Sequence, residues 1–322
     1  MQLGLGGAAV GNLYRAVTEP DAEAAILGAL EGGFELIDTA PYYGHGLSEL
    51  RIGAALRKWQ GPAPLISSKV GRVLDPVAPG EEGDFGFVSP APFRPRFDYS
   101  RSGVRRSLEE SLERLGVAKL AVALVHDVGQ LTHGQAHAQV LRQVLDEALP
   151  ELWRAQGEGL VGAIGIGVNE CDVCHEILAR APLDCILLAG RYTLLEQPAL
   201  TSGLLDVCAG RGVSVMAAGV FNSGLLATAP TSASTYNYAR VPQPMLDRAR
   251  AIWSLCQEHG VAPQGAALRF AAAHPAVSHT IVGARSRAEV DELIAWRAAE
   301  IPGALWTALK ARGFLSAEAP TP

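Results

Sequence analysis

The sequence predicts a single-domain (β/α)8 barrel, a fold in which eight parallel strands alternate with helices. Eight short apolar runs of strand length alternate with helical segments along the 322 residues, and such an alternation over this length is typical of the fold. No linker or shift in composition divides the chain, so one domain covers residues 1–322. Polar side chains also stand where several of the runs end, and barrel enzymes place their active sites at the carboxyl ends of the strands.

The predicted strands are short apolar runs bounded by turn residues. They lie within residues 3–10 and at 34–37, 65–69, 120–125, 163–168, 185–188, 214–218 and 280–282. The opening run also fits the GxGxxA pattern of a dinucleotide-binding loop, but that pattern requires a strand before its first glycine. Only three residues precede Gly4. We therefore interpret the glycines as a first strand and its exit loop, where small residues let a ligand approach.

The predicted helices follow from apolar residues spaced three and four apart and from the residues at their ends. The first begins at Thr18, has Pro20 in its first turn and stops at Gly32. Ser48 is the expected N-cap of the second. The other helical segments are 104–115, 135–158 with a break at Pro150, 172–181, 204–211, 242–260, 264–273 and 288–297. Residues 316–322 are expected to form a frayed tail.

Charge and composition argue against several classes of function. The net charge of -6 disfavours nucleic acid or an anionic membrane as a partner. No apolar run reaches transmembrane length, and the N-terminus lacks the features of a signal peptide. Five cysteines in a chain of this length do not suggest a disulfide framework, so we expect a cytoplasmic protein. The segment CDVCH at 171–175 matches a haem-attachment pattern, which requires an exported chain; we interpret it as coincidental and predict no metal.

Four side chains at or just after the predicted strand ends suggest proton-transfer chemistry. Asp38, Lys69 and His126 each stand where a strand ends, and Tyr43 follows Asp38 in a glycine-flanked loop. A phenol is a useful acid or base only if its pKa of about 10 moves towards neutrality, and a nearby cation does this by favouring the phenolate. We therefore predict that Lys69 lies beside Tyr43 and that Asp38 holds the lysine.

Several motifs occur in order along nearly the whole chain and resemble those of the aldo/keto reductase family. They are IDTAPYYG around Asp38 and Tyr43, SSKV around Lys69, VHD around His126, GVN at 167–169, RYTLLEQ at 191–197 and VGARS at 282–286. The stretches AVGNLYRAV, FDYSRSGV, LLAGRYTLLEQ and GVFNSGLLA further resemble the aldose 1-dehydrogenase subgroup, which acts on L-fucose, L-galactose and D-threo-aldoses.

The resemblance implies a nicotinamide cofactor that lies in the barrel mouth without a separate Rossmann domain. Tyr43 would be the general acid/base, and His126 would hydrogen-bond the reacting oxygen. The implied cofactor-binding residues are Asn169 at the carboxamide, Tyr192 stacked on the nicotinamide ring, Phe221, Asn222 and Ser223 along the pyrophosphate, and Gly283, Arg285, Ser286 and Glu292 at the adenosine end.

The identity of the nicotinamide cofactor depends on the charges near its adenosine end. Many NADP-using relatives carry a lysine or arginine near the positions of Gly283 and Glu289. Here Glu289 would repel a 2′-phosphate, whereas Arg285 and Arg287 could attract one. We predict NAD, with NADP as the alternative. Glu289 also completes an SxxE capping box, which is its structural explanation.

Residues 70–100 form the longest stretch without a clear structural pattern. They follow Lys69 directly and contain five prolines and four phenylalanines. A long ordered loop in a compact domain is usually functional, so we predict an excursion that folds over the barrel mouth and selects the substrate. The alternative is a proline-rich disordered insert. The predicted substrate contacts are Tyr42, His45, Phe93 and Arg94.

The predicted function is the oxidation of the anomeric C1 hydroxyl of a free aldose to its lactone, with hydride transfer to NAD(P)⁺. L-fucose, L-galactose and D-arabinose are the expected kinds of sugar. One alternative is an aldehyde or pyridoxal redox enzyme of the same fold, and another is a cofactor-binding regulatory subunit. The presence of Asp38, Tyr43, Lys69 and His126 together favours turnover.

Overall fold

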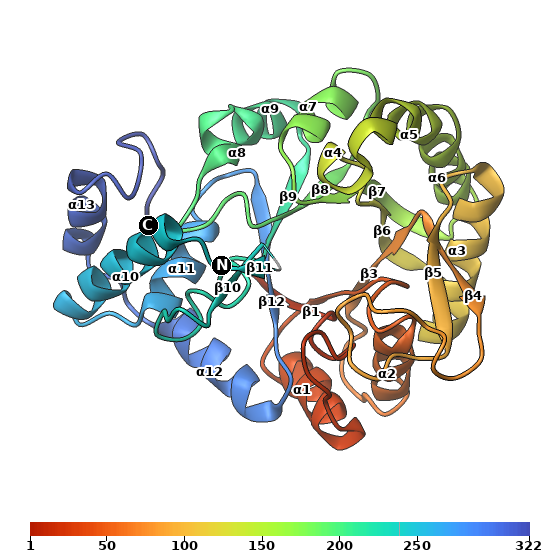
Figure 1. The fold of residues 1–322 in the computed structure, drawn as a ribbon, viewed down its shortest axis with the longest axis horizontal. Coiled ribbons are helices and arrows are strands. Elements are labelled where there is room, and N and C mark those ends of the chain that lie inside the picture. Colours follow the sequence, from red (N-terminus) through yellow and green to blue (C-terminus); the bar gives the residue numbers. More distant parts are fainter. Residues whose placement is uncertain (238) are drawn as a thin grey trace.

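Eight parallel strands close into a barrel in the computed structural model, which describes residues 1–237 and 239–322 (Figure 1). In chain order these strands are β1 (Leu3–Gly6), β2 (Leu36–Asp38), β3 (Leu65–Val70), β6 (Leu120–His126), β7 (Val161–Val168), β8 (Cys185–Ala189), β9 (Ser214–Ala218) and β12 (Val277–Gly283). The barrel closes because β1 pairs with both β2 and β12, as Gly4 lies between Leu36 and Ile281. The predicted barrel is therefore confirmed, and β1 belongs to it rather than to a dinucleotide-binding fold.

Helices surround the barrel, as Figure 1 shows. They are α1 (Glu19–Glu31), α2 (Leu47–Leu56), α3 (Arg101–Leu115), α4 (Gln130–His133), α5 (His137–Gln143), α6 (Leu149–Gly157), α7 (Asp172–Leu178), α8 (Pro198–Thr201), α9 (Leu204–Arg211), α10 (Gln243–Glu258), α11 (Pro263–Ala271), α12 (Arg287–Ala298) and α13 (Gly303–Ala311). Among the described residues, no helix is both long and apolar enough to cross a membrane.

The apolar side chains form two buried layers on the two faces of the strands. A small cluster that includes Leu36, Leu124, Leu187, Met216 and Ile281 is drawn from five different barrel strands. A much larger cluster packs the strands against the helices. Successive strand residues point to opposite faces, so Leu36 and its neighbour Ile37 belong to different clusters. This packing fixes the strand ends from which the active-site loops begin.

The helix ends follow the sequence signals at some positions and depart from them at others. Thr18 caps α1 by accepting a hydrogen bond from the Asp21 amide, as predicted. The prediction for Ser48 is wrong because Gly46, with φ of 95°, precedes α2, and the Ser48 hydroxyl donates to the Gly7 carbonyl. The expected break at Pro150 is also absent. A π-helical turn, Val144–Ala148, joins α5 to α6, so the proline falls in the first turn of α6, where its missing N–H is not needed.

The segment after β3 contains an antiparallel hairpin, which the sequence analysis did not predict. Its strands are β4 (Arg72–Pro76) and β5 (Phe93–Phe97), and Figure 1 shows them beside α3, outside the ring of barrel strands. The hairpin loop returns to the loop after β1, where Leu13 forms a bridge with Phe87. The proline-rich stretch therefore carries an antiparallel hairpin directly after β3, which argues against the alternative of a disordered insert.

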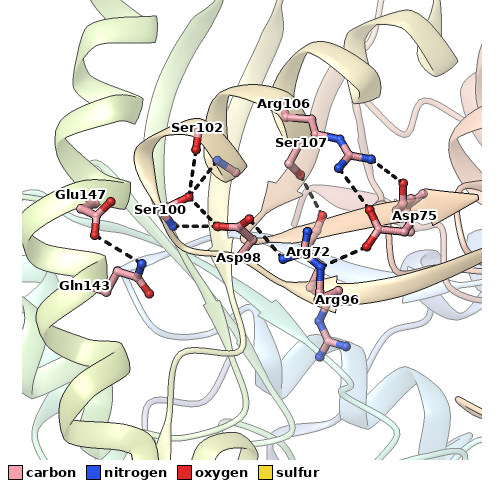
Figure 2. Close-up of polar contacts among 12 residues, drawn as sticks. Arg72, Asp75, Arg96, Asp98, Ser100, Ser102, Arg106, Ser107, Gln143 and Glu147 are labelled. Atoms are coloured by element: carbon pink, nitrogen blue, oxygen red, sulfur yellow. Dashed lines mark hydrogen bonds and ion pairs between the residues drawn. The ribbon is translucent and has the colours of Figure 1, made fainter.

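Charged side chains tie this hairpin to α3 (Figure 2). Asp75 forms ion pairs with Arg96 at 3.0 Å and with Arg106 at 3.1 Å. The Ser107 hydroxyl donates to the Arg72 carbonyl at 3.0 Å. The hairpin is thus anchored from outside the barrel by contacts that do not involve the predicted catalytic residues.

Two smaller features complete the described chain. A short antiparallel pair, β10 (Thr235–Tyr236) and β11 (Ala239–Arg240), lies in the segment between β9 and α10. Residues 316–322 form neither helix nor strand, and Ala319 within them is buried.

Candidate active site

A buried ion pair lies at the carboxyl ends of two neighbouring strands. Asp38 ends β2 and pairs in register with Ser67 of β3, two residues before Lys69. The Lys69 ammonium donates to Asp38 at 2.6 Å and to the Thr39 carbonyl at 2.8 Å, and the Ser67 hydroxyl donates to the other Asp38 oxygen at 2.8 Å. Burial raises the pKa of Asp38, while Lys69 and Ser67 oppose that rise. The contacts hold the ammonium in one position.

Tyr43 lies over this ammonium. The Lys69 nitrogen is 4.7 Å from the centre of the Tyr43 ring, so the predicted neighbourhood of cation and phenol is present. The loop that carries Tyr43 packs tightly on the loop after β1. A side chain at Gly44, where φ is 63°, would come within 2.4 Å of the Gly11 carbonyl oxygen. Only glycine fits at position 44. The close contact between the two loops therefore fixes the backbone position of Tyr43.

His126, at the end of β6, faces Tyr43. The two ring centres are 6.0 Å apart and the rings are nearly perpendicular. Burial lowers the pKa of His126 to about 3, the charges of Lys69 and Arg72 add to the effect, and Asp127 opposes it. His126 is therefore neutral near pH 7 and can act as a hydrogen-bonding group, but not as a cation.

A second ion pair beside His126 was missed by the sequence analysis. Arg72, the first residue of β4, donates to the Asp127 carboxylate at 2.5 Å. Its guanidinium carbon also lies 3.8 Å from the centre of the Tyr42 ring and 4.2 Å from that of Phe97. The sequence positions of the two residues indicate that they lie near the site, because Asp127 directly follows a predicted strand and Arg72 comes three residues after Lys69. Neither had a predicted role because each alone resembles an ordinary loop charge.

The four predicted substrate contacts occupy different environments. Tyr42 is half-buried, and its ring centre is 6.1 Å from that of His126. His45 is fully buried; it binds the Phe93 carbonyl through Nδ1 at 2.7 Å, and burial lowers its pKa. Phe93 is half-buried, and exposed Arg94 donates to the Glu81 carbonyl in the hairpin loop. Tyr42 thus lies beside the catalytic group, whereas His45 is covered and Arg94 is engaged elsewhere.

The rings of the hairpin loop line this side of the site. Tyr42 packs edge-on against Phe85 and Phe87, with centres 6.2 Å and 5.3 Å apart. The Tyr43 ring lies 6.2 Å from that of Phe87. Of the four phenylalanines of the excursion, Phe85 and Phe87 therefore form an aromatic wall on this side, whereas Phe97 packs on Tyr99 and His133.

The opposite side of the barrel mouth carries polar groups that fit a nucleotide. Asn222, in the turn after β9, is buried in a left-handed conformation with φ of 49°. Its side-chain oxygen and nitrogen both lack a hydrogen-bond partner, and so does the buried Arg285 Nε, within the described residues. Buried polar groups are normally paired, so these atoms are suited to a polar ligand. Two further predicted residues follow barrel strands: Ser223, also left-handed, in the turn after β9, and Asn169, directly after β7.

The adenosine end of the expected site is organised by Glu289. Ser286 caps α12 by accepting from the Glu289 amide at 3.3 Å, as predicted. The Glu289 carboxylate accepts from the Arg285 amide at 2.8 Å and pairs with Arg15 at 2.8 Å. Arg287 points to other partners, Glu31 and Asp291. The Glu289 carboxylate thus interacts with Arg15 and Arg285, the two arginines near the start of α12.

Tyr192 does not occupy the predicted position. It is 1% exposed, and its ring centre is 5.0 Å from that of Phe270 on α11 and 6.2 Å from that of His274. A ring packed between the barrel and an outer helix presents no face to the barrel mouth. The expectation that Tyr192 stacks on the nicotinamide therefore does not fit the structure, because its apolar ring is used in the core.

The remaining predicted cofactor residues lie around α12. Phe221 packs edge-on against Trp296 of α12, with ring centres 6.1 Å apart. Gly283 ends β12 and is exposed, and a side chain there would approach Ala9 at 3.3 Å. Glu292 is exposed in the second turn of the helix. These residues border the site without a contact that assigns them a role.

Comparison with known proteins agrees with this geometry. The aldo/keto reductase family model matches residues 2–311. The chain is 38% identical to D-threo-aldose 1-dehydrogenase of a Pseudomonas species, over 95% of this chain and 92% of that protein. It is 37% identical to pyridoxal 4-dehydrogenase of Microbacterium luteolum, over 98% and 94%. The solved structure of a Gluconobacter oxydans glycerol dehydrogenase shares the fold, with a TM-score of 0.73, 21% identity, and coverage of 99% and 93%. The chain belongs to the aldo/keto reductase family and is an oxidoreductase.

Proposed function

We propose that this enzyme oxidises the anomeric C1 hydroxyl of a free aldose to the lactone, with NAD⁺ as hydride acceptor. The observation that carries the proposal is the Lys69 ammonium, fixed by buried Asp38 and 4.7 Å from the centre of the Tyr43 ring. Three relatives bear names of aldose oxidation: the Pseudomonas enzyme, L-galactose dehydrogenase of Arabidopsis thaliana at 28% identity, and D-arabinose 1-dehydrogenase of Saccharomyces cerevisiae at 32% over 63% of this chain.

The roles of the side chains follow from their contacts. The Lys69 charge favours the phenolate of Tyr43, which takes the proton of the C1 hydroxyl as general base. Asp38 keeps the ammonium in place. Neutral His126 hydrogen-bonds the same oxygen and orients it. A bound nicotinamide would supply a hydride acceptor, so the sugar would lose one hydride from C1 in addition to the proton that Tyr43 takes, and would become the lactone.

Asn222 and Arg285 are the residues whose unpaired buried atoms best fit the nucleotide. Glu289 supports NAD over NADP, since it faces Arg15 and Arg285. A 2′-phosphate would have to compete with this carboxylate for the two arginines and would meet its negative charge. The ribose 2′-hydroxyl of NAD could instead donate a hydrogen bond to it.

The hairpin loop supports a selective role at the mouth. Tyr42, Phe85 and Phe87 offer an aromatic wall, and sugar sites combine such walls with a few polar groups. We propose L-fucose, L-galactose or D-arabinose as the kind of substrate. All five cysteines are unpaired thiols, which supports a reducing, cytoplasmic location.

Oxidation of pyridoxal is the second candidate function. The relative named pyridoxal 4-dehydrogenase covers 98% of this chain, and the aromatic wall would also suit a flat heteroaromatic ring. The catalytic residues would have the same roles, because pyridoxal in its hemiacetal form also carries an oxidisable carbon with a hydroxyl group.

A substrate panel distinguishes the two candidates. The purified enzyme is assayed with L-fucose, L-galactose, D-arabinose and pyridoxal, each with NAD⁺ and with NADP⁺, by absorbance of the reduced nicotinamide. The proposal predicts the highest kcat/KM for an aldose with NAD⁺, and the lactone as the product. Turnover of pyridoxal without turnover of any aldose would replace the first candidate by the second.

A further inference from the structure

Asp127 is a carboxylate next to the reacting group without a role in the proposed proton transfer. Its Oδ2 lies 3.5 Å from Nε2 of His126, the ring that would bind the reacting oxygen. Its side chain remains 20% exposed, whereas that of Asp38 is 4% exposed. Asp127 is therefore accessible beside the reacting atoms in a way that the buried ion pair is not.

The charge on Asp127 is secured by its neighbours. Burial acts to raise the pKa of Asp127, but the charge and hydrogen bond of Arg72 and the charge of Lys69 oppose it, and that pKa lies below its ordinary value. The carboxylate is ionised near neutral pH and can only accept hydrogen bonds. Arg72 donates to Oδ2.

The backbone also holds this carboxylate in place. Asp127 is left-handed, with φ of 52°, a conformation that is uncommon for residues other than glycine. The Tyr99 hydroxyl lies 3.2 Å and the His133 Nε2 2.9 Å from its carbonyl, and its amide donates to Gly167 at 2.9 Å. Strained conformations held by several contacts are concentrated at functional sites.

A purely structural role would be redundant. If the Arg72–Asp127 pair served only to fix the hairpin, it would duplicate the contacts of Asp75 with Arg96 and Arg106 and of Ser107 with the Arg72 carbonyl (Figure 2). Those contacts hold the outer side of the hairpin, whereas the Arg72 side chain reaches the catalytic side.

We propose that Asp127, held by Arg72, accepts a hydrogen bond from the hydroxyl on the carbon next to the reacting carbon, and so selects substrates that carry a C2 hydroxyl. This inference rests on the proposed aldose oxidation. Asp127 Oδ2 lies 3.5 Å from His126 Nε2, and the oxygens on C1 and C2 of a sugar are direct neighbours. When His126 binds the C1 oxygen, Asp127 is therefore placed to reach the C2 hydroxyl. Asp127 is then a substrate-contacting residue and Arg72 its positioning residue.

The test compares a sugar with its 2-deoxy derivative. D-arabinose and 2-deoxy-D-ribose differ in the C2 hydroxyl, and L-galactose and 2-deoxy-L-galactose provide a second pair. A hydrogen bond to a charged group contributes more than one between neutral groups, so the wild type should prefer the parent sugar by about tenfold to a hundredfold in kcat/KM. Asp127→Ala should bring this ratio close to one, mainly by lowering kcat/KM for the parent sugar.

Further variants separate recognition from folding. Asp127→Asn keeps the shape and one acceptor oxygen, so it should retain part of the preference. Arg72→Lys keeps the cation and should preserve more of it than Arg72→Met. Asp75→Asn is the matched control, because it removes a hairpin carboxylate that pairs with arginines but does not contact His126; its ratio should equal that of the wild type.

The outcomes are distinguishable. If the wild type turns over both sugars of a pair equally, or if Asp127→Ala lowers both by the same factor, Asp127 does not recognise the C2 hydroxyl and the inference is overturned. If the wild type oxidises no aldose at all, the proposed function itself has failed, and the inference fails with it.

Discussion

Replacing Glu289 by glutamine should change the cofactor preference. The variant keeps the shape of the side chain but removes one negative charge from the end of α12, where Arg15 and Arg285 converge. A 2′-phosphate carries about two negative charges. At a separation of about 6 Å, its repulsion by one carboxylate amounts to about 1.4 kcal/mol in a water-like dielectric and about twice that at half the dielectric constant. The Glu289 carboxylate is 32% exposed, so solvent screens this repulsion and the two energies given above apply rather than the larger energy of a buried pair.

This energy predicts that kcat/KM with NADP⁺ rises by roughly tenfold to a hundredfold in Glu289→Gln. With NAD⁺ it should fall or stay nearly constant, since only the contact with the ribose hydroxyl is weakened. The assay is kcat/KM for each cofactor at a fixed aldose concentration and constant ionic strength. Asp291→Asn is the matched control: it makes the same charge change on the same helix, but Asp291 pairs with Arg287. A wild-type preference for NADP⁺ of tenfold or more, or equal responses of the two variants, would refute the reasoning.

Three further predictions follow from the site. Lys69→Met should abolish most of the turnover and lower the unfolding free energy by about 3–5 kcal/mol, because it leaves Asp38 buried without its cation. In urea unfolding, the double variant that also carries Asp38→Asn should recover part of this loss. Additive losses of the two single variants would contradict an interaction between Lys69 and Asp38. For His126, the unfolded state binds a proton below about pH 6.5 whereas the folded state, with its pKa of about 3, does not. Stability should therefore decrease as the pH is lowered below about 6.5, by up to about 1.4 kcal/mol per pH unit, and His126→Gln should lose about 1.7 kcal/mol less than the wild type between pH 6.5 and pH 5; parallel stability curves would show that His126 is not buried in its neutral form. Phe85→Ala and Phe87→Ala should raise KM for the accepted substrate more than they lower kcat, as expected for a binding wall, and an unchanged KM in steady-state kinetics would place selectivity elsewhere.

The barrel could be predicted because its strands are encoded locally. Each run of apolar residues with turn residues at its ends is sufficient to define a buried parallel strand, and all eight predicted runs lie in the barrel. The Lys69–Asp38 pair could be predicted for the same reason, since both residues end neighbouring strands. The hairpin β4–β5 was missed because its strand FRPRF alternates between aromatic and charged residues around a proline, a pattern that tertiary contacts with α3 had to decide.

The errors in the site have a common physical origin. The RYTLLEQ motif predicts Tyr192 at the nicotinamide, but a tyrosine after a strand can turn either to the barrel mouth or to the helix layer, and its neighbour Phe270 lies in the helix layer. Ser48 carried a cap signal, yet its hydroxyl was used by the Gly7 carbonyl from another loop. Arg72 and Asp127 acquired their relation to His126 only through folding. Contacts between loops that are distant in sequence decided all of these cases.

The central claim is that Tyr43 transfers the proton in aldose oxidation and that the Lys69 cation makes this possible by favouring the Tyr43 phenolate. The most direct measurement is kcat of Tyr43→Phe and of the wild type for the preferred aldose with NAD⁺, together with the Kd for NADH from fluorescence titration. We expect kcat to fall by about 10²–10⁴-fold while the Kd changes by less than about threefold, because the phenol acts in the chemical step. A variant with near-normal kcat would contradict the claim, and so would one whose loss of rate is explained by an equal loss of NADH affinity.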